Sequence, residues 1–273
     1  MGISILMSVY AKEKPSYFKE ALLSVINQTL QPDEIVLIKD GPLTDELEDV
    51  ILDCLEIYPN IRTHQFQENV QLGRALQKGV EMCSNELVAR MDTDDIAKKN
   101  RLQLQFEFLS QNKDVAVCGG AIQEFYDDGS YKSVKKMPQG FQNVRKYGKY
   151  RNPVNHMTVM FRKEAILEAG NYRHYPKLED YDLWIRTMAK GYKLDNLSDI
   201  LVEARTNEDF YSRRGGAGYG RRYLKLRKME HTLKITNLFE YILSCVLTIG
   251  MVYSPSKIRK VFYRKALRSK GDN

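Results

Sequence analysis

Short hydrophobic runs alternate with segments of helical periodicity over the first 91 residues, and this alternation limits the possible folds more than any other feature. The first run is almost continuous, which is typical of a strand covered on both faces, whereas the run at 61–66 is weaker. The predicted strands are Ile3–Val9, Glu34–Lys39, Ile61–Phe66 and Glu86–Met91. The helical segments between them lie at residues 18–26, 47–55 and 72–83. This order predicts an α/β fold in which right-handed crossovers build a mostly parallel, twisted sheet flanked by helices.

Polar clusters follow three of these strands, at the points where the strands end. They lie at Ser8–Lys14, Lys39–Pro42 and Asp92–Asp95. In open α/β sheets, ligands bind outside the carboxyl ends of the strands. Residues more than 80 positions apart in the sequence are therefore expected to meet around one crevice.

The net charge of +7 conceals two different parts of the chain. Residues 1–204 contain 26 Lys and Arg against 30 Asp and Glu, whereas residues 205–273 contain 16 against 5. The first part has a net charge of −4 and the second a net charge of +11. A nearly neutral body with a strongly basic end suggests that this end meets an anionic surface.

Three carboxylates stand within four residues at Asp92, Asp94 and Asp95. Each pair of unit charges at about 4 Å repels by about 4 kcal/mol at an effective dielectric constant of about 20, unless a cation or hydrogen-bond donors compensate. In an extended strand Asp92 and Asp94 would point to one side and Asp95 to the other. Carboxylate oxygens suit Mg²⁺ or Mn²⁺, with a substrate diphosphate and water completing the octahedron. The alternative is a solvated acidic loop or the N-cap of a following helix.

Two further positions could contact a nucleotide. Asp40 follows a buried strand and could accept a hydrogen bond from a base, although Asp-Gly is also a common turn sequence. At the start of the third helical segment, Gly73 would permit close backbone approach and Arg74 could face a phosphate or a base. Taken alone, Arg74 also fits a solvated helix position.

Several segments together resemble the family 2 glycosyltransferases, the large inverting group with the GT-A (Rossmann-like) fold. The resemblance spans about residues 3–205, and the segment Asn152–Tyr172 is most similar to bacterial enzymes that build capsule, exopolysaccharide or O-antigen repeat units. The matching segments are Ser4–Tyr10, Asp40-Gly41, Asn69–Gly79, Met91–Ile96 and Glu179–Trp184. One difference is that Lys39 precedes Asp40, where many members have a second acid.

The resemblance implies roles for individual residues. Asp40 would contact uracil or another base, Asp92 the ribose, and Asp94 the Mn²⁺ or Mg²⁺ ion that bridges the two phosphates, with Asp92 beside it. Asp180 would be the catalytic base, with Glu179 next to it. The nucleotide-sugar site implied in this way comprises Tyr10, Asp40, Arg74, Asp92 and Asp94.

The residues near Asp180 fit a general base. Glu179–Lys190 is predicted to be a helix that ends at Gly191, and its N-terminus would lower the pKa of Asp180. Ordinary helix capping would also explain the two acids. His156 and Trp184 are candidate acceptor-binding residues, and core packing is the alternative for both.

The resulting hypothesis is a metal-dependent, inverting glycosyltransferase. It would move a hexose or N-acetylhexosamine from a UDP-sugar to a hydroxyl of a polyprenyl-diphosphate-linked saccharide in bacterial surface polysaccharide synthesis. The expected domain spans residues 1–205, with a nucleotide-binding part to about residue 97 and an acceptor-binding part from residue 98. A nucleotidyltransferase is one alternative, although Tyr10–Lys14 lacks the glycines of its phosphate loop. A basic nucleic-acid-binding protein is the other, although the acidic body would then be unexplained.

The basic region 206–273 is expected to be helical and to associate with a membrane. Leu238–Tyr253 is apolar but shorter than the roughly 20 residues that span a bilayer, so we expect a buried or interfacial helix. Pro255–Lys270 is predicted to form a basic amphipathic helix on anionic lipid, or else a solvated helix packed on the body. Arg213 or Arg214 could contact the diphosphate. Because the N-terminus lacks signal-peptide features, a cytoplasmic protein on the inner face of the plasma membrane is expected, with no nucleic-acid partner.

Overall fold

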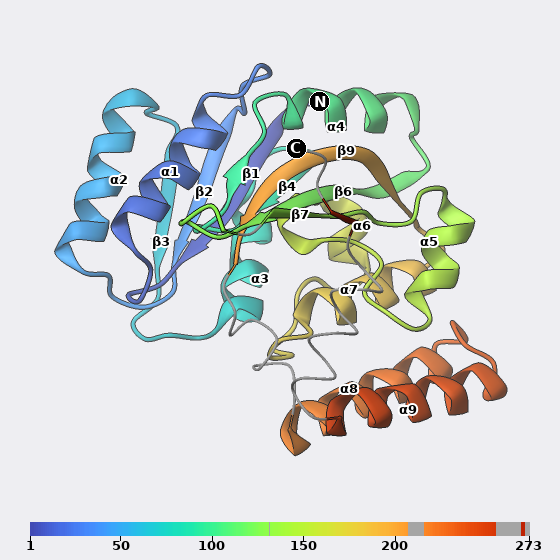
Figure 1. Cartoon of the computed structure of the whole chain (residues 1–273). Coiled ribbons are helices and arrows are strands. Elements are labelled where there is room, and N and C mark those ends of the chain that lie inside the picture. Colours follow the sequence, from blue (N-terminus) through green and yellow to red (C-terminus); the bar gives the residue numbers. More distant parts are fainter. Residues whose placement is uncertain (131, 207–215, 255–268, 271–273) are drawn as a thin grey trace.

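A computed structural model describes residues 1–130, 132–206, 216–254 and 269–270, and a ten-stranded sheet runs through this part of the chain (Figure 1). The strand order is β10-β7-β6-β8-β4-β1-β2-β3, and β9 pairs with both β6 and β5. The strands are β1 (Ile3–Val9), β2 (Glu34–Lys39), β3 (Ile61–Gln65), β4 (Leu87–Met91), β5 (Ile96–Ala97), β6 (Val115–Phe125), β7 (Lys132–Lys135), β8 (Met160–Arg162), β9 (Lys193–Arg205) and β10 (Ser269–Lys270).

The sheet is parallel in its N-terminal half and mixed in its second half. Strands β3, β2, β1 and β4 pair in parallel, as expected for apolar runs that are joined by helices. Strand β8 then pairs antiparallel with β4 and β6, whereas β9 runs parallel to β6. The predicted bounds of the first two strands are confirmed, and the third and fourth strands are each one residue shorter than predicted.

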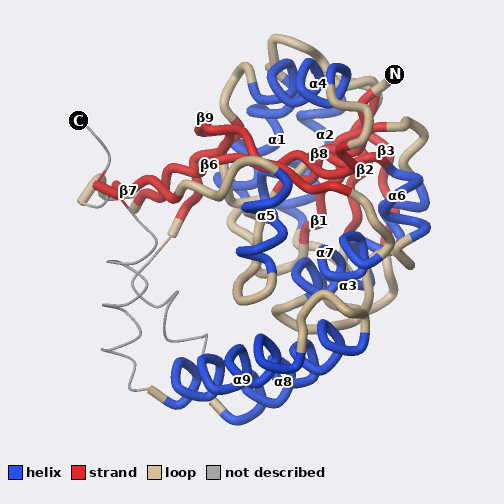
Figure 2. The backbone as a smooth tube through the Cα atoms, turned by 90° about the vertical axis from the view of Figure 1, so that its right-hand side faces the viewer, coloured by secondary structure: helices blue, strands red, loops and turns tan. Residues whose placement is uncertain are grey.

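Helices cover both faces of the sheet, so the fold has three layers (Figures 1 and 2). One face carries α1 (Pro15–Ile26), α2 (Asp45–Ile57) and α4 (Arg101–Gln111). The other carries α3 (Leu72–Met82), α5 (Phe141–Gly148), α6 (Lys163–Glu168) and α7 (Glu179–Ala189). Buried aliphatic side chains fill both spaces between helices and sheet, and their burial is the main stabilising contribution.

The basic end begins with a helical hairpin that lies beyond α7 (Figure 2). Helix α8 spans Ala217–Thr232 and α9 spans Leu238–Tyr253. Of the two alternatives predicted for α9, a buried or an interfacial helix, the buried one is wrong, because most of its large apolar side chains are exposed. In the described ranges no helix combines the length and hydrophobicity needed to cross a membrane.

Two predictions for the basic end concern residues that the structure describes only in part. Arg213 and Arg214 lie outside the described residues, as does 255–268. The last two residues of the predicted tail helix, Ser269 and Lys270, form strand β10 and pair antiparallel with β7.

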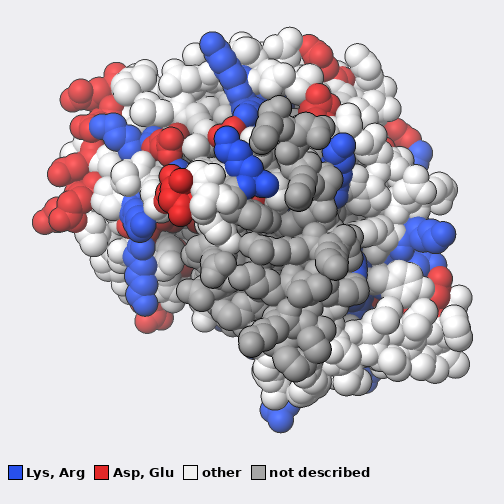
Figure 3. Space-filling model, in the orientation of Figure 1, with Lys and Arg blue, Asp and Glu red and all other residues white. Residues whose placement is uncertain are grey.

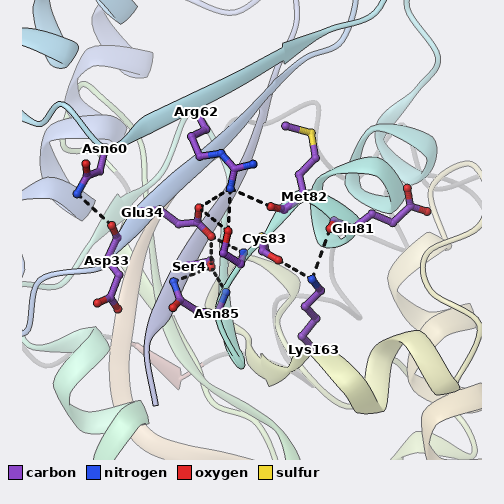
Figure 4. Close-up of polar contacts among 11 residues, drawn as sticks. Ser4, Asp33, Glu34, Asn60, Arg62, Glu81, Met82, Cys83, Asn85 and Lys163 are labelled. Atoms are coloured by element: carbon purple, nitrogen blue, oxygen red, sulfur yellow. Dashed lines mark hydrogen bonds and ion pairs between the residues drawn. The ribbon is translucent and has the colours of Figure 1, made fainter.

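A buried carboxylate fixes the amino ends of the parallel strands, opposite the edge where the polar clusters lie (Figure 4). Glu34, at the start of β2, accepts hydrogen bonds from the Ser4 hydroxyl (2.6 Å) and the Ser84 amide, and it pairs with Arg62 (2.8 Å). Burial alone would raise the pKa of Glu34, but these donors outweigh it and lower the pKa below its ordinary value. Three strands and the turn before β4 are thereby joined at one group.

We expect Glu34→Ala to destabilise the fold by about 1–3 kcal/mol, because Ser4 and Ser84 would lose a buried acceptor. Urea unfolding followed by circular dichroism measures this change. The matched control is Asp53→Ala, which removes an exposed carboxylate from its ion pair with Lys19 and should cost at most about 1 kcal/mol. Equal effects of the two substitutions would contradict a structural role for Glu34.

Candidate active site

The acidic cluster forms the turn between β4 and β5 rather than the end of a strand. The prediction that Asp92 and Asp94 share one side of an extended strand is therefore wrong, because side chains alternate only in extended backbone. Each of the three carboxylates has its own surroundings instead. The turn thus places Asp94 and Asp95, which are neighbours in the sequence, in different environments.

Asp92 is held by a buried arginine. Both terminal nitrogens of Arg90 donate to the two carboxylate oxygens of Asp92, one of them at 2.7 Å, and Arg90 is 2% exposed. Burial opposes the charge on Arg90, but the adjacent Asp92 carboxylate outweighs burial and raises the arginine pKa. This bidentate pair fixes the orientation of the Asp92 carboxylate. Arg90 gives no signal of this role in the sequence, because it lies within a hydrophobic strand.

Asp94 and Asp95 are crowded by negative charge. Burial, Asp92 and Glu13 raise the pKa of Asp94 to about 7. Burial, Asp92 and Asp94 raise the pKa of Asp95 well above its ordinary value, although Asp95 accepts a hydrogen bond from the Arg205 amide (2.8 Å). Glu13, which the sequence analysis did not select, is tied to the same turn by a hydrogen bond from Thr93 (2.8 Å). The turn therefore has more negative charge than its donors balance.

This excess of negative charge fits a divalent cation. Among the described residues, no three His, Cys, Asp or Glu side chains are grouped so that they could hold a metal by themselves. A cation at Asp94 would thus need further oxygen ligands from a diphosphate and water, which is the usual arrangement for Mg²⁺. The chemistry of the donor set is compatible with Mn²⁺ or Mg²⁺ at this position.

Asp40 connects the end of β2 to the loop before α3. It is 6% exposed, and its carboxylate accepts a hydrogen bond from the Val70 amide (2.6 Å). The Asn69 side chain donates to the Asp40 carbonyl at 3.3 Å. Burial raises the pKa of Asp40, against the lowering effect of the backbone amides of Val70 and Gln71. Lys39, the departure from the family pattern, forms an ion pair with Glu48 of α2 (2.7 Å).

Tyr10 and Arg74 are exposed near the same edge of the sheet. Tyr10 directly follows β1 and is 43% exposed, and Arg74 lies in the first turn of α3. The predicted role of Gly73 in close approach to a ligand is not what the structure shows. A Cβ at Gly73 would lie 2.3 Å from the Arg173 carbonyl oxygen and 3.4 Å from the Cβ of Glu179. The glycine therefore allows α3 to approach the start of α7.

Helix α7 begins at the acidic pair, close to its predicted bounds. Asp180 is half-buried, and its two oxygens accept hydrogen bonds from the Asn152 side chain and the Tyr181 amide (2.8 Å). Burial and the Asp180 charge raise the pKa of Glu179 to about 7. Two adjacent acids therefore differ in exposure and in environment.

The buried Tyr172 is within electrostatic range of both acidic groups. Its hydroxyl is buried, which raises its pKa, and the negative charges of Asp180, Glu179 and Asp92 add to the same effect. The positive charge that opposes them is that of Arg90. The structure therefore brings together acids that are almost 90 residues apart in the sequence.

His156 and Trp184 pack next to Tyr172, but only His156 is partly exposed. The His156 Nε2 and the Tyr172 hydroxyl are hydrogen-bonded at 2.9 Å, and the His156 and Trp184 rings meet edge to face. Burial and the Arg90 charge hold the pKa of His156 well below its ordinary value, so the ring is neutral. Trp184 is fully buried, so the prediction that it offers a face to a sugar is wrong.

Arg205, the last residue of β9, fixes the acidic turn from the other half of the fold. Its Nε donates to the Asp94 carbonyl (3.0 Å), and its guanidinium pairs with Glu20 (2.5 Å) and Asp127. The same guanidinium lies 3.9 Å from the centroid of the Tyr17 ring. The sequence analysis used Arg205 only as a boundary, and no local pattern indicated these contacts.

Comparison with known proteins identifies clear relatives. The family model for "Glycosyl transferase family 2" matches residues 4–168. An amylovoran biosynthesis glycosyltransferase, AmsE of Erwinia amylovora, is 34% identical over 96% of this chain and 98% of its own length. An Escherichia coli UDP-Gal:alpha-D-GlcNAc-diphosphoundecaprenol beta-1,3-galactosyltransferase is also 34% identical, over 97% of this chain and 96% of its own. The structure of S. aureus TarS 1-349 with UDP-GlcNAc superposes with a TM-score of 0.70 at 17% identity, over 96% of this chain and 75% of that one.

Because the pKa of Glu179 is raised, its charged carboxylate is expected to lower the stability of the fold at high pH. Between about pH 4.5 and 7 the folded state binds more protons here than the unfolded state, so this contribution to stability falls as the pH rises. We expect Glu179→Gln to raise the melting temperature at pH 8 and to have little effect at pH 5. A thermal unfolding series from pH 5 to pH 8 measures the difference.

The control for this series is Glu46→Gln, at another acid in the first turn of a helix. Hydrogen bonds from its own backbone amide and from Thr44 lower the pKa of Glu46, so its substitution should give no gain at pH 8. A Glu179→Gln variant that is no more stable than the original chain at pH 8 would contradict the conclusion that the charged Glu179 carboxylate destabilises the fold.

Proposed function

The chain belongs to glycosyl transferase family 2, and from this we propose that it moves a hexose or N-acetylhexosamine from a UDP-sugar to a polyprenyl-diphosphate-linked saccharide. It is a glycosyltransferase, and the proposal adds the substrates, inversion at the anomeric carbon and a divalent cation. The E. coli relative supports these substrates, because its name specifies UDP-Gal and a GlcNAc-diphosphoundecaprenol acceptor. The name of the Erwinia amylovora relative supports a role in surface polysaccharide synthesis.

One observation carries the proposal: acids of the Asp92–Asp95 turn and of the Glu179–Asp180 helix start act electrostatically on the same buried tyrosine. Tyr172 senses the charges of Asp92, Glu179 and Asp180 together. A donor held at the first acidic group would therefore place its anomeric carbon near the second. Transfer by direct displacement needs this arrangement, with a leaving group on one side and a proton acceptor on the other.

The donor would be held at the edge formed by the ends of β1, β2 and β4. Asp40 is the proposed contact for the base, Asp92 for the ribose and Asp94 for Mn²⁺ or Mg²⁺, with Tyr10 and Arg74 at the rim. The bidentate contact from Arg90 orients the Asp92 carboxylate. The cation, when bound, would stabilise the negative charge that develops on the departing diphosphate.

Asp180 is the proposed catalytic base. As the acceptor oxygen bonds to the anomeric carbon, the bond to UDP breaks and the hydroxyl proton passes to Asp180. Donors from Asn152 and the Tyr181 amide fix the carboxylate. General-base help of this kind contributes about 10²–10⁴-fold in rate. Glu179 is less suited to the role, because it is 9% exposed and its pKa is raised to about 7.

The remaining parts of the proposal concern the acceptor and the location. His156 would contact the acceptor or the diphosphate as a neutral ring. Residues 1–97 would bind the nucleotide, residues 98–205 the acceptor, and the basic end would hold the protein on the inner face of the plasma membrane. Family membership leaves no support for a nucleotidyltransferase or a nucleic-acid-binding protein as the alternative.

We expect Asp180→Asn to lower transfer by at least about 10²-fold while donor affinity changes little, because the base contacts the acceptor hydroxyl. Incubation with a panel of UDP-sugars and a synthetic lipid-diphosphate acceptor, followed by mass spectrometry, measures transfer. The control is Asp45→Asn, an exposed acid in the first turn of α2, which should keep full activity. Full activity of Asp180→Asn would remove this residue from the mechanism.

We expect Asp94→Asn to weaken UDP-sugar binding in the presence of Mn²⁺ by at least about tenfold and to abolish the benefit of the metal. Isothermal titration calorimetry with and without Mn²⁺ measures both effects. Because the pKa of Asp94 is raised to about 7, Mn²⁺ affinity of the original chain should fall from pH 8 to pH 6. Donor binding that is independent of Mn²⁺ in the original chain would contradict the metal role.

A further inference from the structure

Helix α9 has its polar side buried and its apolar side exposed, the reverse of a helix on a water-soluble domain. The buried positions are Ser244, Thr248 and Val252. The exposed side is formed by large apolar residues, each more than a third exposed: Leu238, Phe239, Ile242, Leu243, Val246, Leu247, Ile249 and Tyr253. Phe239 is the most exposed of them, at 74%. At 3.6 residues per turn these positions form one continuous side along 16 residues.

The polar side of α9 is firmly attached to the protein. Thr248 accepts a hydrogen bond from the buried Arg227 of α8 (3.3 Å). Glu240, the single charged residue of α9, pairs with Lys149 (2.6 Å) and closes the capping box with Asn237. The outward side consequently has no charged group. A contiguous apolar surface of this kind marks a site of interaction with a protein or a membrane.

Exposed basic residues lie on α8, the helix that packs against α9, and in the connection between the two helices. The exposed positions of α8 include Arg221, Lys225 and Lys228, which share one side of that helix at helical spacing, and Lys234 is exposed in the connection to α9. In Figure 3 the surface over the hairpin is mostly uncharged, with Lys and Arg at its margin. Apolar residues beside Lys and Arg are typical of helices that lie in a membrane interface.

We propose that the outer side of α9 inserts into the interface of an anionic lipid bilayer, with the helix parallel to the membrane plane. Such helices bury their apolar side to a depth of about 5–10 Å, while nearby Lys and Arg attract anionic headgroups. The packing of the polar side on α8 excludes a transverse orientation. A second copy of the chain fits less well, because a symmetric contact would bring the basic side chains of two α8 helices together.

The hairpin holds the candidate active site at a fixed distance from the membrane. Arg227 donates to the Tyr181 hydroxyl (2.8 Å) and to the carbonyls of Lys149 and Tyr150, and it pairs with Glu230 (2.8 Å). Tyr181 adjoins Asp180 in α7. Seating α9 in lipid thus places the start of α7 close to a lipid-linked acceptor, a consequence that rests on the proposed function. Membrane insertion itself does not rest on it.

The test uses the full chain and vesicles of phosphatidylglycerol and phosphatidylethanolamine that contain no saccharide lipid or nucleotide. We expect Phe239→Ser/Val246→Ser to lower the vesicle partition coefficient in co-sedimentation by at least about tenfold, which corresponds to about 1.4 kcal/mol. The matched control is Leu52→Ser/Ile57→Ser on α2, where the two residues are 60% and 57% exposed. This control should partition like the original chain. Circular dichroism checks that both variants are folded.

A charge variant and neutral vesicles complete the design. We expect Arg221→Gln/Lys225→Gln/Lys228→Gln to weaken binding to the anionic vesicles and to leave binding to phosphatidylcholine vesicles unchanged. Vesicle binding of Phe239→Ser/Val246→Ser equal to that of the original chain would overturn the proposal. So would a lipid-free dimer that this variant dissociates while vesicle binding persists. Vesicle binding combined with no sugar transfer in the separate assay with UDP-sugars and the lipid-diphosphate acceptor would refute the proposed function and leave the membrane surface in place.

Discussion

The concentration of negative charge in the turn after β4 is the constraint on which the rest of the site depends. Three aspartates share four residues, and Glu13 adds a fourth carboxylate. The buried Arg90 balances Asp92, and the backbone amide of Arg205 satisfies one oxygen of Asp95. The negative charge that these donors do not compensate is concentrated at Asp94. Arg90 also acts electrostatically on Tyr172 and Glu179, so its guanidinium influences both acidic groups.

Burial gives chemically similar neighbours different properties throughout this region. Glu179 and Asp180 are adjacent, yet one is buried with a raised pKa and the other is half-exposed and fixed by two donors. His156 and Trp184 contact one another, yet only His156 is partly exposed. Helix α9 shows the same principle on a larger scale, since its polar side is buried against the protein and its apolar side is exposed. Residue type alone does not determine these roles, because the surrounding elements set the exposure of each side chain.

The strands of the parallel half could be predicted from the sequence because buried strands are continuous apolar runs, as in Ile3–Val9 and Glu34–Lys39. The grouping of acidic residues at one edge of the sheet could also be predicted, because the carboxyl ends of parallel strands lie at the same edge. The turn geometry of Asp92–Asp95 did not follow, because extended and turn backbone fit the same residues. Arg90 was missed because it lies within a hydrophobic strand. Glu13 and Arg205 were missed because their partners are distant in the sequence, 80 and 110 residues away. The periodicity of α9 indicated an apolar side but not which side would pack against the protein.

The pairing of β9 with β5 has a consequence for synthesis on the ribosome. Strand β5 follows the acidic turn directly, and its partner in the described sheet is β9, which ends at Arg205. The nascent chain therefore contains all three aspartates long before it contains the strand that holds their turn in place. Until about 110 further residues have been translated, the turn lacks both that strand and the amide that Asp95 accepts from. The acidic turn therefore reaches its final arrangement late in translation, after the parallel half of the sheet has had time to form.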